Sequence, residues 1–302
     1  METQVFIRKN NPEDSRVYEK IFEGIRISSK NKHFQLNAPE NWQIFEQDCT
    51  MNCDDVSIDA FSNLYLYKTM KFEYVRQMLV RKQLRLENTS SWDDKYENFF
   101  LKERFFMKGV GSVDARSHIW QTFGQSWTTI EESDAFWRIY SPDHKSVKIK
   151  VNARKLIESI LIDELSLATT FIGRVEYCSV DDINTNIKES VDSAGFQKVW
   201  GRVMPKMFFY KRDEFSHEQE FRIIRLLDSD EYRKYSPSYV VYDIEPNSLI
   251  EEICFDSRLC QCEYKERKQI LLDLGYEENR ICQSQINNFS PINIELRTGD
   301  SL

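Results

Sequence analysis

Two glutamates separated by one residue, Glu218 and Glu220, stand directly before the apolar segment 221–224. Side chains of a strand alternate between its two faces, so residues i and i+2 share a face. Two carboxylates on one face raise each other's pKa and can divide acid, base and electrostatic roles between them. The alternative interpretation is an exposed strand edge that carries charge and pairs with Arg222.

The other residue types that carry chemistry form no recognised motif. The four histidines are His33, His118, His144 and His217, and neither G-x-S-x-G nor H-E-x-x-H accompanies them. The nine glycines form neither G-x-G-x-x-G nor G-x-x-x-x-G-K-[ST]. We therefore expect neither a Rossmann nor a P-loop site, and a bound dinucleotide would have to be held by a different fold.

The seven cysteines indicate a reducing compartment. Cys254, Cys260 and Cys262 form a C-x5-C-x-C group, and the other four are dispersed. An odd count argues against a disulfide framework. A structural zinc site needs a repeated C-x2-4-C spacing, which is missing, so we expect no metal site and mostly buried thiols.

Apolar patterns outline the elements that must position these groups. Strands are expected at 64–67, 120–128, 147–151, 174–178, 221–227, 239–244 and 250–255. The strand at 147–151 should be half-buried, because Lys148 and Lys150 alternate with apolar residues. Helices are expected around 74–79, 156–161 and 270–274, the last ending at Gly275. Strands mixed with helices, without strict βαβ alternation, predict an α+β fold.

Residues 1–60 read as an N-terminal appendage to a domain at 61–302. The appendage contains one expected amphipathic helix, with Val17, Ile21 and Phe22 after the capping Asp14. No run approaches the ~18–20 apolar residues that span a bilayer. The first residues are polar and do not resemble a signal peptide. We therefore expect a cytoplasmic protein with no membrane partner.

Three segments, in order, resemble the motifs of the ADP-ribosyltransferase superfamily. Leu-Tyr-Leu-Tyr-Lys-Thr-Met (64–70), then a helix and Leu-Arg-Leu (84–86), resembles its opening strand and helix. Phe-Gly-Gln-Ser-Trp-Thr-Thr (123–129) resembles its second motif, an aromatic residue followed by S-x-[ST]. Glu-Gln-Glu (218–220) resembles its third motif. The resemblance implies a split β-sheet core with surrounding helices, and NAD as a substrate.

The chain also resembles an uncharacterised bacterial family over residues 61–275. The segments that carry this resemblance are Leu-Tyr-Lys (66–68), Trp-Asp-Asp-Lys-Tyr-Glu (92–97), Trp-Arg-Ile-Tyr (137–140) and Glu-Gln-Glu-Phe-Arg-Ile (218–223).

The superfamily resemblance implies a role for each candidate residue. Glu220 would be the catalytic glutamate that hydrogen-bonds the nicotinamide-ribose 2′-hydroxyl and stabilises an oxocarbenium-like state. Glu218 would orient or deprotonate the acceptor. Ser126 would support the nicotinamide pocket and Glu220, and Tyr67 or Lys68 would hold the cofactor. Lys68 stands where Arg or His is usual and lacks the bidentate fork of Arg.

Trp137 and Tyr140 lie at i and i+3 of an expected helix, and therefore on one face. They could stack on nicotinamide or adenine, or they could be ordinary core aromatics. Both interpretations predict a helix over 137–140.

Charge gives mixed indications about partners. The net charge of −8 opposes long-range attraction of nucleic acid, whereas residues 70–108 have a basic bias. The resemblance implies a mono-ADP-ribosyltransferase, a toxin or phage-defence effector, with RNA or DNA favoured over protein as acceptor. It also implies a possible neutralising antitoxin protein, for which residues 1–60 would be the docking element.

Two other functions remain open from the sequence. A metal-dependent nuclease or phosphoesterase would use Asp93, Asp94, Glu97 and Glu220. A non-catalytic interaction protein would use exposed aromatics and the 1–60 segment as a partner surface.

Overall fold

The structure of the protein is a computed structural model. It describes residues 26–27, 35–37, 56–57, 61–94, 96–97, 104–107, 111–114, 120–162, 169–194, 207–227 and 238–289. The helix expected around 17–22 lies outside these residues. The division of the chain at residue 60 therefore stays a prediction.

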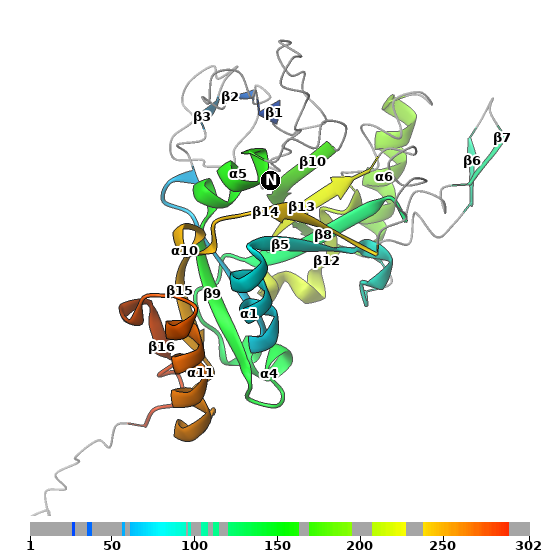
Figure 1. The fold of residues 1–302 in the computed structure, drawn as a ribbon. Helices are drawn as coiled ribbons and strands as arrows, with labels where there is room; N and C mark the ends of the chain where they lie inside the picture. The colour runs from blue at the N-terminus through cyan, green and yellow to red at the C-terminus, as the bar shows by residue number, and fades with distance from the viewer. Residues whose placement is uncertain are drawn as a thin grey trace, which may run out of the picture.

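A nine-stranded sheet forms the centre of the described chain (Figure 1). Its strands are β4 (Tyr65–Lys71), β5 (Gln83–Asn88), β8 (Thr122–Thr128), β9 (Ser146–Asn152), β10 (Thr169–Arg174), β13 (Glu220–Leu226), β14 (Tyr239–Asp243), β15 (Ile250–Phe255) and β16 (Ile281–Gln283). The main order is β10-β13-β8-β4-β9-β15-β16, and β5 with β14 branches from β8. Neighbours run antiparallel except β15 and β16.

The sheet splits between β4 and β8. These two strands pair only at Tyr67 and Thr128. Further along, β8 pairs with β5 instead, through Gly124 and Phe123. Strand β4 meanwhile pairs with β9 along all of Tyr65–Lys71. The expected split sheet is therefore present, and peptide groups of β4 and β8 lose their ladder partners where the strands part.

Six helices lie around the sheet in the described chain. They are α1 (Phe72–Arg81), α4 (Asp134–Tyr140), α5 (Ala153–Ile162), α6 (Val180–Ala194), α10 (Pro246–Leu249) and α11 (Gln261–Asp273). The mixture of helices with a mostly antiparallel sheet confirms the expected α+β class. No helix among the described residues is long and apolar enough to cross a membrane.

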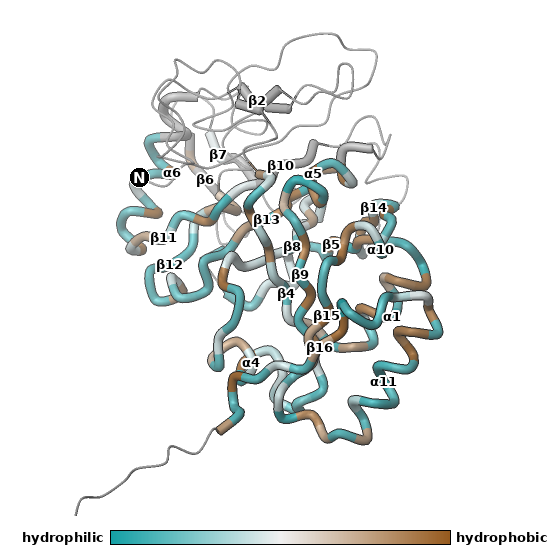
Figure 2. The backbone as a smooth tube through the Cα atoms, turned by 90° about the vertical axis from the view of Figure 1, so that its left-hand side faces the viewer, coloured by the Kyte–Doolittle hydropathy of each residue, from teal (hydrophilic) through white to brown (hydrophobic). Residues whose placement is uncertain are grey.

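One cluster of buried apolar side chains joins the helices to the sheet. Val147, Ile149 and Val151 of β9 belong to it, together with Leu156 and Ile160 of α5. Figure 2 shows hydrophobic residues along β9 and β15, whereas α11 is mostly hydrophilic. Burying an aliphatic side chain of this size stabilises the fold by ~1.5–3 kcal/mol. The core thus fixes β9, and β9 in turn fixes the register of β4.

Two details of burial differ from the sequence-based expectation. Strand β9 is not half-buried, because Lys148 is only 7% exposed. The stem of Lys148 is covered and its ammonium donates to the Glu131 carbonyl at 2.7 Å. The helical spacing in 74–79 also groups Tyr74 with the apolar residues of α1, but Tyr74 lies about 100° around the axis from the buried Val75 and is 55% exposed.

Helix α11 ends as expected at Gly275, whose φ is 80°. The Gly275 N–H donates to Leu272 O at 2.9 Å and the Tyr276 N–H to Leu271 O at 3.0 Å. This pair of bonds is the Schellman motif, and its left-handed position suits glycine because no Cβ is present.

Smaller elements complete the described chain. Short strands are β1 (Arg26–Ile27), β2 (Gln35–Asn37), β3 (Val56–Ser57), β6 (Arg104–Met107), β7 (Gly111–Asp114), β11 (Glu176–Cys178) and β12 (Tyr210–Arg212). The 3-10 helices are η3 (Thr89–Ser91), η5 (Asp213–Glu218) and η6 (Glu278–Arg280). The expected strand at 174–178 is divided between the end of β10 and β11, which pairs in parallel with β12.

Candidate active site

The two glutamates do converge, but not as neighbours on one strand. Glu218 is the last residue of η5, and Glu220 is the first residue of β13. Gln219 between them has a left-handed backbone, with φ of 42°. The expectation that both side chains share a strand face was therefore wrong. The left-handed residue separates the end of η5 from the start of β13, and both carboxylates reach the same ammonium.

That ammonium belongs to Lys211 of β12. Its Nζ lies 2.5 Å from Glu218 Oε2 and 2.5 Å from Glu220 Oε1. Glu97 Oε1 is 3.1 Å from the same atom. Each of these side chains is less than a tenth exposed. Charges this deeply buried must be paired, and three carboxylates therefore surround one cation.

Arg222 is the second cation of the cluster, and its side chain is 1% exposed. Its Nε donates to Glu220 Oε2 at 2.6 Å, and its other nitrogens donate to Phe208 O and to Glu97. The alternative interpretation of a pair between Glu220 and Arg222 is thus correct in its contact. It is wrong about exposure, because the pair is buried and does not lie at an exposed strand edge.

The pKa values of the two glutamates are pushed apart. Burial raises the pKa of Glu218, and the adjacent Glu220 carboxylate raises it further. Burial alone would also raise the pKa of Glu220, but the Arg222 guanidinium and the Lys211 ammonium hold it well below its ordinary value. Separated values assign different roles to the two groups. Glu220 is a fixed anion, and Glu218 is the group able to exchange a proton.

The backbone around Glu220 is fixed by neighbours from three strands. Thr128 of β8 pairs with Glu220 of β13 and with Tyr67 of β4, so the three residues form one row across the sheet. The Thr128 hydroxyl donates to Glu218 O at 2.6 Å. The Glu220 N–H donates to the Tyr177 hydroxyl oxygen at 2.8 Å. Tyr67 therefore lies two strands away from Glu220, with Thr128 between them.

Lys68 lies where β4 and β8 part. Its Nζ donates to Ser126 O at 2.6 Å, across the gap that the strand ladder no longer closes. Burial lowers the pKa of Lys68 to about 8, although the Glu220 carboxylate acts in the opposite direction. Lys68 is therefore a cation near neutral pH with a weakened hold on its proton.

Two cavities meet at this point. A small one of about 90 Å3 is lined by Tyr67, Lys68, Thr69, Ser126, Trp127, Thr128, Phe136, Tyr140, Glu218 and Glu220. A second one, of about 500 Å3, shares Lys68, Thr69, Ser126 and Tyr140 with the first. It extends over α1, β5 and β14 to Lys71, Arg81, Arg85, Glu87, Trp92 and Tyr239. The carboxylates thus stand at the end of a longer cavity.

Tyr140 and Trp137 share helix α4 but not the site. The Tyr140 hydroxyl donates to Glu218 Oε1 at 3.0 Å, and its ring lines both cavities. Trp137 is 1% exposed, and its indole N–H donates to Glu132 at 3.1 Å. It lines neither cavity. The structure therefore places Trp137 among the core aromatics and Tyr140 at the glutamates.

Trp92 closes one wall of the larger cavity. The Arg222 guanidinium lies over its ring, 4.7 Å from the centroid. On the other side a Cβ added to Gly124 would come within 2.6 Å of the indole. Gly124 is thus a position where a ring approaches a strand so closely that a larger residue would force a neighbouring group to shift.

The acidic set of the nuclease hypothesis does not converge on one vacant point. Asp94 pairs with Arg212 at 3.1 Å. Glu97 and Glu220 share Lys211 and Arg222, so side-chain cations stand where a metal ion would bind. Elsewhere in the described chain, Glu252, Cys254 and Cys282 offer ligand atoms within 4.8 Å of one another.

Two site residues escaped the sequence reasoning. Lys211 had no assigned role, although it lies in an aromatic segment, 207–212, just before the glutamates. Glu97 was assigned only to the nuclease hypothesis. A lysine or a glutamate alone is too common to be singled out, and only the folded chain places both beside Glu220.

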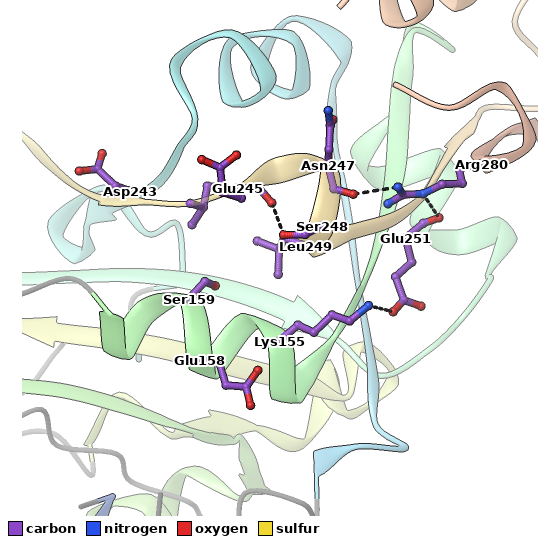
Figure 3. A pocket seen from close by; sticks show the side chains of 11 residues that line it. Lys155, Glu158, Ser159, Asp243, Glu245, Asn247, Ser248, Leu249, Glu251 and Arg280 are labelled. Atoms are coloured by element: carbon purple, nitrogen blue, oxygen red, sulfur yellow. Dashed lines mark hydrogen bonds and ion pairs between the residues drawn. The ribbon is translucent and has the colours of Figure 1, made fainter. Parts of the chain in front are cut away.

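A larger cavity of about 840 Å3 lies away from these residues, between α5, α10 and β15. Figure 3 shows Lys155 pointing to Glu251 and Arg280 bonded to the Asn247 backbone. Its Lys155 pairs with Glu251, while Glu158 and Glu245 pair with Arg154 and Lys82 outside the lining, and none of the expected site residues lines it. The convergence of polar groups favours the cavity at the glutamates.

The chain is similar to one protein family and to a group of solved structures. Residues 136–223 match the model of a family described as a protein of unknown function, DUF2971. This match contains the 137–140 and 218–223 segments and confirms the expected resemblance to an uncharacterised family. No curated protein matches the chain.

Solved structures of DarT from Thermus sp. 2.9 share weak similarity with the chain. The complex with NAD+ is 12% identical, with a TM-score of 0.33, and the match covers 74% of this chain and 96% of that one. The complex with ADP-ribosylated single-stranded DNA is 13% identical, with a TM-score of 0.32, covering 74% and 94%.

Proposed function

We propose that the protein is an NAD-dependent mono-ADP-ribosyltransferase. The observation that carries the proposal is the convergence of Lys68, Ser126 and Tyr140 on Glu218 and Glu220 at the split of the sheet. Lys68 and Ser126 are 58 residues apart in the sequence, and Tyr140 and Glu218 are 78 apart, yet all of these residues line one small cavity that shares residues with a longer one.

The cavity of about 500 Å3 suits a dinucleotide in size and charge. Small-molecule sites typically occupy ~300–1,000 Å3. Lys68, Lys71, Arg81 and Arg85 line it against one carboxylate, Glu87. A surplus of cations attracts the diphosphate of NAD, and the cavity lies where β4 and β8 part. No glycine-rich loop is needed for this mode of binding.

The chemistry follows from the fixed anion. Cleavage of the nicotinamide–ribose bond leaves its electron pair on the nicotinamide nitrogen and positive charge on the sugar. Glu220 is ionised and held from both oxygens, so it can stabilise that charge without reorganising. Its role toward the 2′-hydroxyl is part of the same proposal.

Glu218 is suited to act as the base that takes a proton from the acceptor. Its raised pKa makes it a better base than an ordinary carboxylate. A nucleophilic acceptor atom would bond to the sugar carbon and transfer its proton to Glu218. Tyr140 donates to Glu218 at 3.0 Å and orients it for this task.

We propose a nucleic acid as the acceptor class, in preference to protein. Much of the basic bias around α1 is neutralised, because Arg76 pairs with Glu73 and Lys82 with Glu245. Lys71 and Arg81, which are exposed, have no ion pair among the described residues and stand beside the cavity. Such side chains contact phosphates.

The test uses NAD labelled in its adenylate group, incubated with the full-length protein and separate pools of RNA, single-stranded DNA and cell protein. Nicotinamide release and label transfer are measured for wild type, for Glu220→Gln and for Glu214→Gln. Glu214 is an exposed acid of η5 and serves as the matched control.

Label in a nucleic-acid pool, lost with Glu220→Gln and kept with Glu214→Gln, supports both the reaction and the acceptor class. Label only in the protein pool overturns the acceptor class and keeps the reaction. No NAD consumption by the folded wild type in any pool overturns the reaction and returns the interaction-protein hypothesis.

We further propose a toxin or phage-defence role, with a neutralising partner protein that docks on residues 1–60. The support is the sequence resemblance. Induced expression of wild type should slow growth, whereas Glu220→Gln should not. A partner captured by the full chain but not by a chain lacking residues 1–58 would support the docking element, and equal capture would overturn it.

A further inference from the structure

Two thiols meet at the start of helix α11, outside the cavities described above. Cys260 is the N-cap of the helix, and Cys262 is in its first turn. Both are exposed. Their Sγ atoms lie 2.9 Å apart. Two accessible thiols in direct contact are arranged for reaction with each other, since their sulfurs need to approach only a little further to reach the S–S bond length of about 2.05 Å.

The environment makes Cys260 the more reactive of the two. The contact with Cys262 lowers the pKa of Cys260, and the Glu263 N–H, 3.5 Å from its Sγ, adds to the effect. The same contact raises the pKa of Cys262. The nearby Glu263 carboxylate opposes the thiolate, but Lys145 pairs with it at 2.8 Å. A thiolate is thus favoured at Cys260, with a protonated thiol beside it.

The other described cysteines are less exposed than Cys260 and Cys262, and the pKa of two of them, Cys178 and Cys254, is raised. Burial raises the pKa of Cys178 to about 12. Cys254 is buried, and its contact with Cys282 and its burial raise its pKa. Accessible, low-pKa cysteines beside a resolving thiol are the ones that respond to oxidants. The contrast within one chain makes a selective reaction testable.

We propose that Cys260 and Cys262 form a reversible dithiol–disulfide pair that reacts with low-molecular-weight disulfides. The Cys260 thiolate attacks one sulfur of the small disulfide, forms a mixed disulfide and releases one small thiolate. Cys262 then loses its proton and attacks the Cys260 sulfur, which releases the second small thiolate. The two electrons and two protons lost by the cysteines end on two small thiol molecules.

The test exploits the sequence around the pair. Trypsin cleaves after Arg258 and Lys265, so Cys260 and Cys262 fall in one peptide, 259–265, that contains no other cysteine. The reduced full-length protein is incubated with oxidised glutathione, and its remaining thiols are alkylated. The protein is then digested with trypsin, and the peptide masses are measured by mass spectrometry. Wild type should give an unalkylated 259–265 peptide that is two hydrogens lighter than its reduced form, and a reductant should restore the reduced mass. This peptide should be oxidised before the peptides that contain Cys178 and Cys282 are modified.

Single variants separate the two roles. Cys262→Ser should accumulate the glutathione adduct on Cys260, because the resolving thiol is missing. Cys260→Ser should lose most of the reaction at this peptide. Both substituted positions are exposed, and an unchanged midpoint of thermal unfolding would confirm that the variants fold. Full alkylation of both cysteines in wild type, or modification of Cys178 and Cys282 at the same rate, would overturn the proposal.

Discussion

The ammonium of Lys211 lies 2.5 Å from Oε1 of Glu220. Without a cation, two adjacent buried carboxylates would tend to hold a proton between them. Lys211 touches both members of the pair; together with Arg222, the larger influence, it keeps Glu220 ionised, whereas burial keeps the pKa of Glu218 raised. The difference between two glutamates two residues apart is thus created by their contacts.

Replacing Glu220 by Gln should lower the rate of nicotinamide release by about a hundredfold to a thousandfold, the usual effect of losing one preorganised electrostatic contact. The amide keeps the shape of the side chain but removes its charge. Initial rates at saturating NAD measure the effect. A variant with wild-type rates and native unfolding behaviour would remove Glu220 from the mechanism, and Glu214→Gln gives the baseline.

Replacing Lys211 by Met should shift the acid limb of the activity profile to higher pH. The pKa values of Glu218 and Glu220 rise when the ammonium is lost, so protonation begins at a higher pH as the solution is acidified. Arg222, Glu97, Tyr140 and Tyr177 remain around the pair. Lys211→Arg keeps the charge and should keep the limb near its original position.

Loss of Lys211 should also destabilise the fold by about 3–5 kcal/mol, because buried carboxylates are left with one cation fewer. Urea unfolding measures this. A changed stability with an unmoved acid limb would mean that Lys211 supports the fold and not the ionisation of the pair.

The affinity for NAD should weaken as the pH rises through about 8, the pKa of Lys68. Below that value the ammonium is charged and attracts the diphosphate, and above it the charge is lost. Titration calorimetry between neutral and alkaline pH measures the trend. In Lys68→Arg the side chain stays charged, so the affinity for NAD should remain high across this pH range. In Lys68→Met the charge is absent, so the affinity should be weak and equally independent of pH. A wild-type dependence that persists in both variants would assign it to another group.

Replacing Gly124 by Ala should destabilise the protein by about 1–3 kcal/mol, as overpacking usually does. The new Cβ would lie 2.6 Å from the Trp92 ring and 2.9 Å from Ile224 Cδ1. Urea unfolding gives the difference in free energy. Adding Trp92→Phe should recover part of it, because the smaller ring leaves room. No recovery would mean that Ile224 alone sets the limit.

The sequence by itself determined the local parts of this structure. Apolar patterns predicted β13, β14 and β15 nearly to their ends, whereas β4 continues four residues beyond its expected end, and the glycine after α11 predicted its left-handed C′ position. These features depend on side chains a few residues apart, whose spacing is written in the chain. The same holds for the closeness of Glu218 and Glu220.

Tertiary structure alone decided how those two glutamates are charged. Glu97 meets Arg222 across 125 residues of sequence, and Lys211 joins them from a separate strand. Trp137 and Tyr140 share one helix, yet the fold buries the first and turns the second to Glu218. Ion pairing and burial depend on the path of the whole chain, because desolvation and Coulomb energies are set by distance in space and not by distance in sequence.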